Sequence, residues 1–113
     1  MQVSNLETEF MNIDIVNSTD KLIIRLVGRL EEHDAITFTE RLLQETKDHL
    51  APIIEIDLSA CESLGTLGFG ALVSVRLSES FFGRKVFLKG ANAELSAHIK
   101  ILKLHQIFEG LPE

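Results

Sequence analysis

The chain has 113 residues, which suits one domain of ordinary size and is too few for two. Hydrophobic residues make up 45% of it and charged residues 25%, a balance that allows a folded core and excludes global disorder. Because 11 Lys and Arg stand against 17 Asp and Glu, the formal charge is −6, the wrong sign for broad attraction to nucleic acid or an anionic membrane. Proteins are therefore the expected partners.

Cysteine use and hydropathy indicate the compartment. Cys61 is the only cysteine, so neither an internal disulfide nor a zinc site of several cysteines can form, and Glu62 beside it should raise rather than lower the thiol pKa. No apolar run approaches the ~18 residues of a membrane span. Glu7 and Glu9 stand where a secretory leader would be basic and apolar. These features predict a cytoplasmic protein with no membrane segment.

The first part of the chain predicts a β-hairpin. Residues 1–10 are polar with scattered apolar side chains, and we interpret them as a lead-in or part of an edge strand ahead of a domain over 11–113. Alternation over 11–16 predicts a half-exposed strand, and the β-branched run 22–27 predicts a more buried one. The polar residues 17–20 have turn chemistry, so the two strands are expected to pair antiparallel.

A helix is predicted from Asp34, as its N-cap, to about Leu50, because Pro52 cannot continue it. Its apolar face is expected to hold the residues that recur at helical spacing, which are Ile36, Thr39, Leu43, Thr46 or Lys47, and Leu50. The mostly apolar run 53–58 follows as a strand. Its lack of clean alternation predicts an interior strand, buried on both faces by helices.

A second helix is predicted after a loop over 59–65. It spans 67–82 and ends at Gly83. The residues expected to face inward are Leu72, Val75 and Phe82.

A strand over 85–89 and a last helix complete the order. Asn92 is the expected N-cap of that helix. Its inward positions, at i, i+4 and i+7, are Leu95, Ile99 and Leu102. Residues 107–108 close as a short strand or a packed tail. The order ββαβαβα contains two strand-helix-strand units, so it predicts an α/β domain with a mixed sheet flanked by helices.

Two stretches at fixed places in this order resemble motifs of the STAS domain family, the fold of bacterial anti-sigma factor antagonists. Residues 28–35, Gly-Arg-Leu-Glu-Glu-His-Asp-Ala, are similar to a family pattern of glycine, any residue, Leu-Asp, three residues and Ala, with Glu31 in place of Asp. Residues 57–72 are similar to the family's strand-ending Asp-Leu-Ser, short loop and Asp-Ser-Ser-Gly-Leu-Gly helix start. The resemblance covers 11–108 in architecture, and it implies a single STAS-like domain.

The resemblance also implies a phosphorylation site. In the family, the first hydroxyl residue after the loop aspartate is phosphorylated by the kinase activity of an anti-sigma factor and dephosphorylated by a PP2C-type phosphatase. That place is Thr66, although Gly65 replaces the aspartate and Leu67 replaces the second serine. The residues expected to contact the partner are Glu31, Ser63, Gly65, Thr66, Leu67, Gly68 and Phe69.

The residues themselves leave a structural role open for Thr66. Its hydroxyl could cap the second helix, which would stabilise that helix by ~1 kcal/mol, and Ser63 is a rival cap. The glycines at 65, 68 and 70 permit a tight turn and the close approach of another chain, with Phe69 expected to be exposed among them. A phosphate on Thr66 would be tolerated at a helix N-terminus and would disrupt a docking surface.

The leading hypothesis is a regulatory binding protein without enzymatic activity, which docks a serine/threonine kinase-like anti-sigma factor and is switched at Thr66. An alternative is a constitutive STAS subunit of a transporter ATPase or signalling scaffold, favoured by Gly65 and Leu67. A third is a phosphoaspartate receiver built on Asp57. No cofactor or metal is expected, because His98 and His105, on one predicted helical face, have no carboxylate companion. Self-association stays open.

Overall fold

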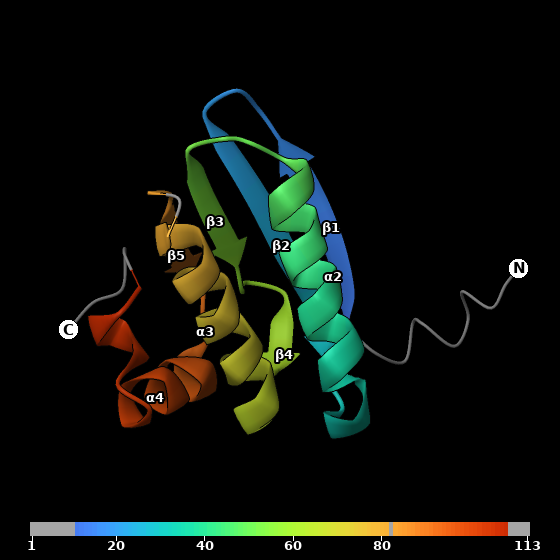
Figure 1. The fold of residues 1–113 in the computed structure, drawn as a ribbon. Coiled ribbons are helices and arrows are strands. Elements are labelled where there is room, and N and C mark those ends of the chain that lie inside the picture. Colours follow the sequence, from blue (N-terminus) through green and yellow to red (C-terminus); the bar gives the residue numbers. More distant parts are fainter. Residues whose placement is uncertain (1–10, 82, 109–113) are drawn as a thin grey trace, which may run out of the picture.

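Five strands form one mixed sheet with the order β1-β2-β3-β5, and the short β4 pairs with the end of β2 (Figure 1). The computed structural model describes residues 11–81 and 83–108. The strands are β1 (Asn12–Asn17), β2 (Lys21–Arg29), β3 (Ile53–Asp57), β4 (Cys61–Ser63) and β5 (Lys85–Lys89). The β1–β2 hairpin is antiparallel and the other pairs are parallel, so the predicted hairpin and the predicted mixed sheet are confirmed.

Three α-helices accompany the sheet, and short 3-10 turns precede the first and follow the last. The helices are α2 (Ala35–Asp48), α3 (Gly65–Phe81) and α4 (Ala93–Ile101), and the turns are η1 (Glu32–Asp34) and η2 (Leu104–Gln106). The helices α2 and α3 lie side by side on one face of the sheet, and α4 lies next to the start of α3 (Figure 1). The core therefore lies between this face and the helices.

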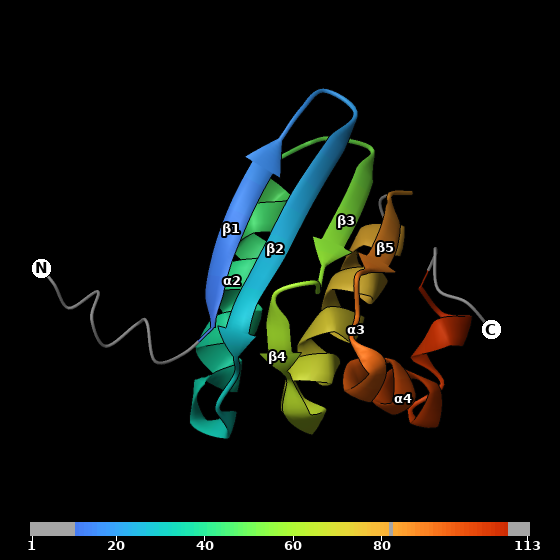
Figure 2. The same cartoon turned by 180° about the vertical axis from the view of Figure 1, so that it is seen from behind.

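No helix of the described residues covers the opposite face of the sheet (Figure 2). In β3, Ile54 and Ile56 point into the core, while Glu55 and Asp57 are partly exposed on the other face. Cross-strand ion pairs occupy that face, with Lys21 Nζ and Lys89 Nζ each 3.2 Å from Glu55 Oε1. The prediction of an interior strand is confirmed, but the prediction of helices on both its faces is wrong.

The helix α2 buries a different stripe from the predicted one. The core residues of the helix are Ala35, Phe38, Leu42 and Thr46, whereas Ile36 is 76% exposed and Leu50, beyond the helix, is 87% exposed. Asp34 precedes the helix but makes no capping hydrogen bond, and its Oδ2 lies 3.4 Å from His33 Nε2. The η1 turn brings the chain into the helix with Ala35 buried, and this sets which face of the helix packs against the core. Of the predicted stripe, only Thr46 is buried on that face.

The second half follows the prediction with local differences. The predicted loop contains β4, because Gly28 pairs with Cys61 and Arg29 pairs with Ser63, and α3 begins at Gly65. In α3, Leu72 and Val75 are fully buried, as predicted, and Phe82 lies outside the described residues. The strand β5 has the predicted bounds.

The last helix confirms the predicted cap. Asn92 Oδ1 accepts a hydrogen bond of 2.8 Å from the backbone N–H of Leu95. Leu95 and Ile99 are buried, but Leu102 follows the helix and is 37% exposed. The predicted face shared by His98 and His105 is wrong, because the chain turns at Lys103, with a φ of 60°, and His105 belongs to η2.

The chain ends, in its described part, as a packed tail. Phe108 is buried beyond η2, in agreement with one of the two predicted forms of residues 107–108. The predicted lead-in over 1–10 lies outside the described residues. Among the helices of the described part, none is long and apolar enough to cross a bilayer.

Candidate functional site

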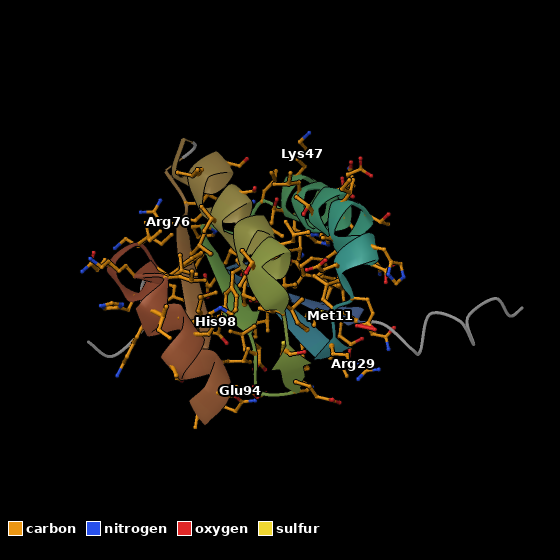
Figure 3. All side chains as sticks on the ribbon, turned by 90° about the horizontal axis from the view of Figure 1, so that it is seen from below. Met11, Arg29, Lys47, Arg76, Glu94 and His98 are labelled. Carbon is orange, nitrogen blue, oxygen red and sulfur yellow. The ribbon has the colours of Figure 1, made fainter. Side chains whose placement is uncertain are left out.

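The predicted site residues lie at one edge of the sheet, where β2 and β4 end. Because α2 and α3 each return from this edge toward the start of the next parallel strand, both helices begin here. Figure 3 looks at this edge from below, with α2 and α3 side by side and Arg29 next to β4. The backbone N–H of Leu30 donates to the carbonyl of Ser63 at 3.1 Å, so Glu31 and Ser63 are held near each other.

Thr66 is the second residue of α3, and it is exposed. Within the described part of the chain, its hydroxyl makes no hydrogen bond, and neither does the hydroxyl of Ser63, which is exposed on β4. The predicted capping role of either residue is therefore wrong. The hydroxyl of Thr66 has no structural task in the fold and faces solvent.

Gly65 starts α3 in the left-handed region, with a φ of +69°. A Cβ built at this position would meet no heavy atom within 4 Å. Glycine adopts this backbone without steric cost, and Asp and Asn adopt it more readily than most other residues. The place of the family aspartate therefore has room for a side chain, but an aspartate there would carry the strain of a positive φ that glycine avoids.

Gly68 and Phe69 lie inside the protein rather than on its surface. A Cβ on Gly68 would lie 2.9 Å from both Leu30 Cδ2 and Leu64 Cβ, so this glycine allows a close approach within the chain itself. Phe69 is 2% exposed, and its ring centroid lies 4.8 Å from that of His98 in an edge-to-face contact. The expected exposure of Phe69 is wrong, because residue 69 precedes Leu72 by three and shares its buried face.

Leu67 remains at the surface beside a groove between α2 and α3. Leu67 is 53% exposed, and Ile36 on α2 is exposed on the opposite side. The groove has a volume of about 340 Å³, and its lining residues are Ala35, Ile36, Thr39, Glu40, Leu67, Gly70, Ala71 and Ser74. Ile36 belongs to the stripe that helical spacing predicts as buried, and this prediction is wrong. The segment has two apolar stripes at helical spacing, so the sequence carries no signal that Ile36, rather than Phe38, stays at the surface.

The side chains that could ligate a metal ion are dispersed over the described part of the chain. Among the described residues, no group of three or more His, Cys, Asp and Glu side chains lies close enough together to hold one. Burial raises the pKa of the Cys61 thiol to about 11, and the charge of Glu62 acts in the same direction. The single thiol is therefore a core side chain and a poor nucleophile.

This thiol gives a test with a defined pH dependence. At pH 8, iodoacetamide is expected to alkylate native Cys61 about 100-fold more slowly than Cys61 in the unfolded chain, since thiolate is the reactive form. The native rate should rise with pH until about 11. Because the unfolded thiol ionises at a lower pH, the stability due to protonated Cys61 is lost as pH rises toward 11. Mass spectrometry over time measures both rates, and equal rates at pH 8 would contradict the buried position.

The carboxylate of Asp57 is engaged in contacts within the sheet and the turn after it, which does not suit the phosphate-accepting aspartate of a receiver domain. Its Oδ1 accepts a hydrogen bond of 2.9 Å from the N–H of Ser59, and its Oδ2 lies 3.3 Å from Arg25 Nε. Partial burial acts to raise the pKa of Asp57, but the hydrogen bonds from Ser59 and Arg25 outweigh burial and lower it.

The topology also contradicts the receiver hypothesis. A receiver needs acidic residues after its first strand, close to the acceptor aspartate. Here β1 runs antiparallel to β2, so β1 ends at Asn17, at the opposite edge of the sheet from Asp57. Residues that follow β1 therefore cannot share a site with Asp57.

Comparison with known proteins agrees with this architecture. The family model of the STAS domain matches residues 12–112. The anti-sigma factor antagonist SpoIIAA in its unphosphorylated form is 13% identical, with a TM-score of 0.72 over 91% of this chain and 89% of that one. An anti-sigma factor antagonist from Mycobacterium paratuberculosis is 20% identical, with a TM-score of 0.70 over 93% and 88%.

A third solved structure has the same fold. It is a variant of RsbS from Moorella thermoacetica, which is 17% identical, with a TM-score of 0.70 over 90% of this chain and 88% of that one. The TM-scores of these three structures show a shared fold, and the family match covers nearly the whole chain. The protein described here belongs to the STAS domain family.

Proposed function

We propose that this protein is an anti-sigma factor antagonist that works by partner switching. Its unmodified form binds a serine/threonine kinase-like anti-sigma factor at the edge formed by Ser63 to Leu67, and phosphorylation of Thr66 releases that partner. A PP2C-type phosphatase restores the binding form. The protein acts in the cytoplasm and catalyses no reaction itself. The observation that supports this most is the exposed hydroxyl of Thr66, which has no bond within the described chain and lies beside exposed Leu67.

The position of Thr66 suits a switch of binding rather than a switch of fold. Phosphorylation would add ~1.5 to 2 negative charges near the N-terminus of α3, where unpaired N–H groups and the helix dipole favour an anion. The domain should therefore stay folded. The same charge next to Leu67 would have to lose its water when a partner covers that side chain, and this cost weakens binding.

The switch is tested by a phosphorylation assay on matched variants. Incubation with a purified anti-sigma factor kinase of the same organism and ATP should add one phosphate to the wild type and none to Thr66→Ala, as measured by intact mass. Thr66→Glu should bind the kinase ~10-fold or more weakly by calorimetry, which is ~1.4 kcal/mol. Thr19→Ala, in the exposed β1–β2 turn at the opposite edge of the sheet, is the control and should accept phosphate as the wild type does. An unchanged mass gain in Thr66→Ala would remove Thr66 from the proposal.

The departures at Gly65 and Leu67 favour a second candidate, a constitutive STAS subunit of a transporter ATPase or a signalling scaffold. Restoring the family's carboxylate separates the two. Gly65→Asp places an acceptor beside the Thr66 hydroxyl at a position with open space, so we expect faster phosphorylation than in wild type. Gly65→Asn, which has the same backbone tolerance and no charge, is the control. If wild type and both variants stay unmodified and the wild type copurifies with transporter subunits, the constitutive role is favoured.

A further inference from the structure

The groove between α2 and α3 has features of a receptor for a side chain from another protein. It involves the first two turns of α2 and the first three of α3, with Ile36 on one wall and Leu67 on the other. Both side chains are large, apolar and mostly exposed. Its lining also includes Gly70 and Ala71, which have little or no side chain, and a Cβ on Gly70 would meet no atom within 4 Å. The space between the walls is therefore open.

We propose that this groove receives one segment of the anti-sigma factor, anchored by an aliphatic or aromatic side chain between Ile36 and Leu67, with a Lys or Arg facing Glu40. This inference rests on the proposed function and adds to it the chemistry of the partner. A volume of about 340 Å³ accommodates one or two side chains and lies near the lower limit of small-molecule pockets. An anchor residue of a protein fits it better than a metabolite.

The charge of Glu40 determines which residue should accompany the apolar anchor in the partner segment, namely a Lys or Arg. Of the residues that line the groove, all within the described part of the chain, Glu40 alone carries a charge. The whole chain has a formal charge of −6, so a basic partner surface is attracted at long range as well as at Glu40. An acidic or uncharged polar segment would leave Glu40 without a favourable contact and would bury Ile36 against polar groups.

The groove also explains how Thr66 acts on binding. Thr66 lies one helical turn before Gly70, which lines the groove, so a phosphate on Thr66 would lie near the rim of the groove. An anchor that covers Leu67 would force this dianion out of water. Phosphorylation then opposes the same contact that holds the unmodified complex together.

Filling the groove from inside is the most direct test. Gly70→Leu places a side chain where space is open, and replacing a helical glycine should leave the fold at least as stable. We expect Gly70→Leu to bind the purified anti-sigma factor kinase ~10-fold or more weakly by calorimetry, with Gly70→Ala in between. Glu40→Gln should reduce the salt dependence of binding. Urea unfolding confirms that each variant is folded.

Two isoleucines provide a matched pair, since Ile36 and Ile101 are each 76% exposed and only Ile36 lines the groove. Ile36→Ser should weaken binding as Gly70→Leu does, and Ile101→Ser on α4 should not. If Gly70→Leu fails to fold, the comparison of Ile36→Ser with Ile101→Ser shows whether the partner uses the groove.

Other outcomes overturn the inference. If the wild type binds and both Gly70→Leu and Ile36→Ser bind equally well, the groove is not used, while the proposed function stands. If the wild type does not bind the kinase at all, the proposed function and this inference both fail. If the wild type sediments as a dimer that Gly70→Leu converts to a monomer, the occupant is a second copy, and the inference is wrong.

Discussion

Phe69→Ala is expected to lower the free energy of unfolding by about 3–4 kcal/mol, because it removes a whole aromatic side chain from a packed core. Phe69 is 2% exposed and lies edge to face with His98 on α4, so the substitution leaves a cavity between α3 and α4. Equilibrium unfolding in urea, followed by circular dichroism, measures the loss.

Leu67→Ala is the control, since it truncates a side chain two residues away that is 53% exposed. It should change stability by no more than about 0.5 kcal/mol and should weaken partner binding instead. The two variants therefore separate a core residue from a docking residue within the same turn. If Phe69→Ala keeps the wild-type urea midpoint but binds the partner more weakly, Phe69 contacts the partner rather than the core, and the packing described above is contradicted.

The sequence predicts an element well where local chemistry decides its form. The strand β5 alternates between exposed lysines at its ends and buried Val86 and Leu88, so its bounds follow from the pattern. The cap at Asn92 depends only on a residue three positions later in the chain, Leu95. The β1–β2 hairpin likewise depends on two neighbouring strands and the turn between them.

Predictions were wrong where the local sequence allows two arrangements and tertiary contacts with distant residues determine which one forms. The segment that forms α2 has apolar residues on two stripes, one through Ile36 and Leu43 and one through Phe38 and Leu42. Helical periodicity cannot rank them, and packing against the sheet and α3 selects the second. The open face of β3 was missed for a similar reason, because the partners of Glu55 come from β2 and β5.

The family motifs predict where in the chain the candidate site lies. Which of its residues are exposed, and which surface they form, can be seen only in the structure. The family pattern gave Thr66, but its exposure, and the loss of a capping role, depend on where α3 begins. The groove needs α2 and α3 side by side, with Ile36 and Gly70 facing the same gap although they are far apart in the sequence. Only the tertiary fold brings them together.

Arg84→Ala is the second substitution with a large expected effect. Arg84 lies just before β5, and its guanidinium donates to the backbone carbonyls of His49 at 2.6 Å, Ala51 at 2.7 Å and Thr46. These carbonyls belong to the last turn of α2 and the residues after it, where no further helical N–H is available. Removing the guanidinium leaves partly buried acceptors without this donor, and we expect a loss of about 2–3 kcal/mol.

Two further variants, Arg84→Lys and Lys85→Ala, test whether the lost guanidinium hydrogen bonds cause the loss of stability in Arg84→Ala. Lysine keeps the charge but not the planar fork that reaches three carbonyls, so Arg84→Lys should lose about half as much as Arg84→Ala. Lys85 is the exposed neighbour, and Lys85→Ala should change stability by no more than about 0.5 kcal/mol. In hydrogen exchange, amides of the last turn of α2 should exchange faster in Arg84→Ala, because that turn loses its link to the start of β5. Equal stability of Arg84→Ala and Lys85→Ala would show that the end of α2 is held by packing alone.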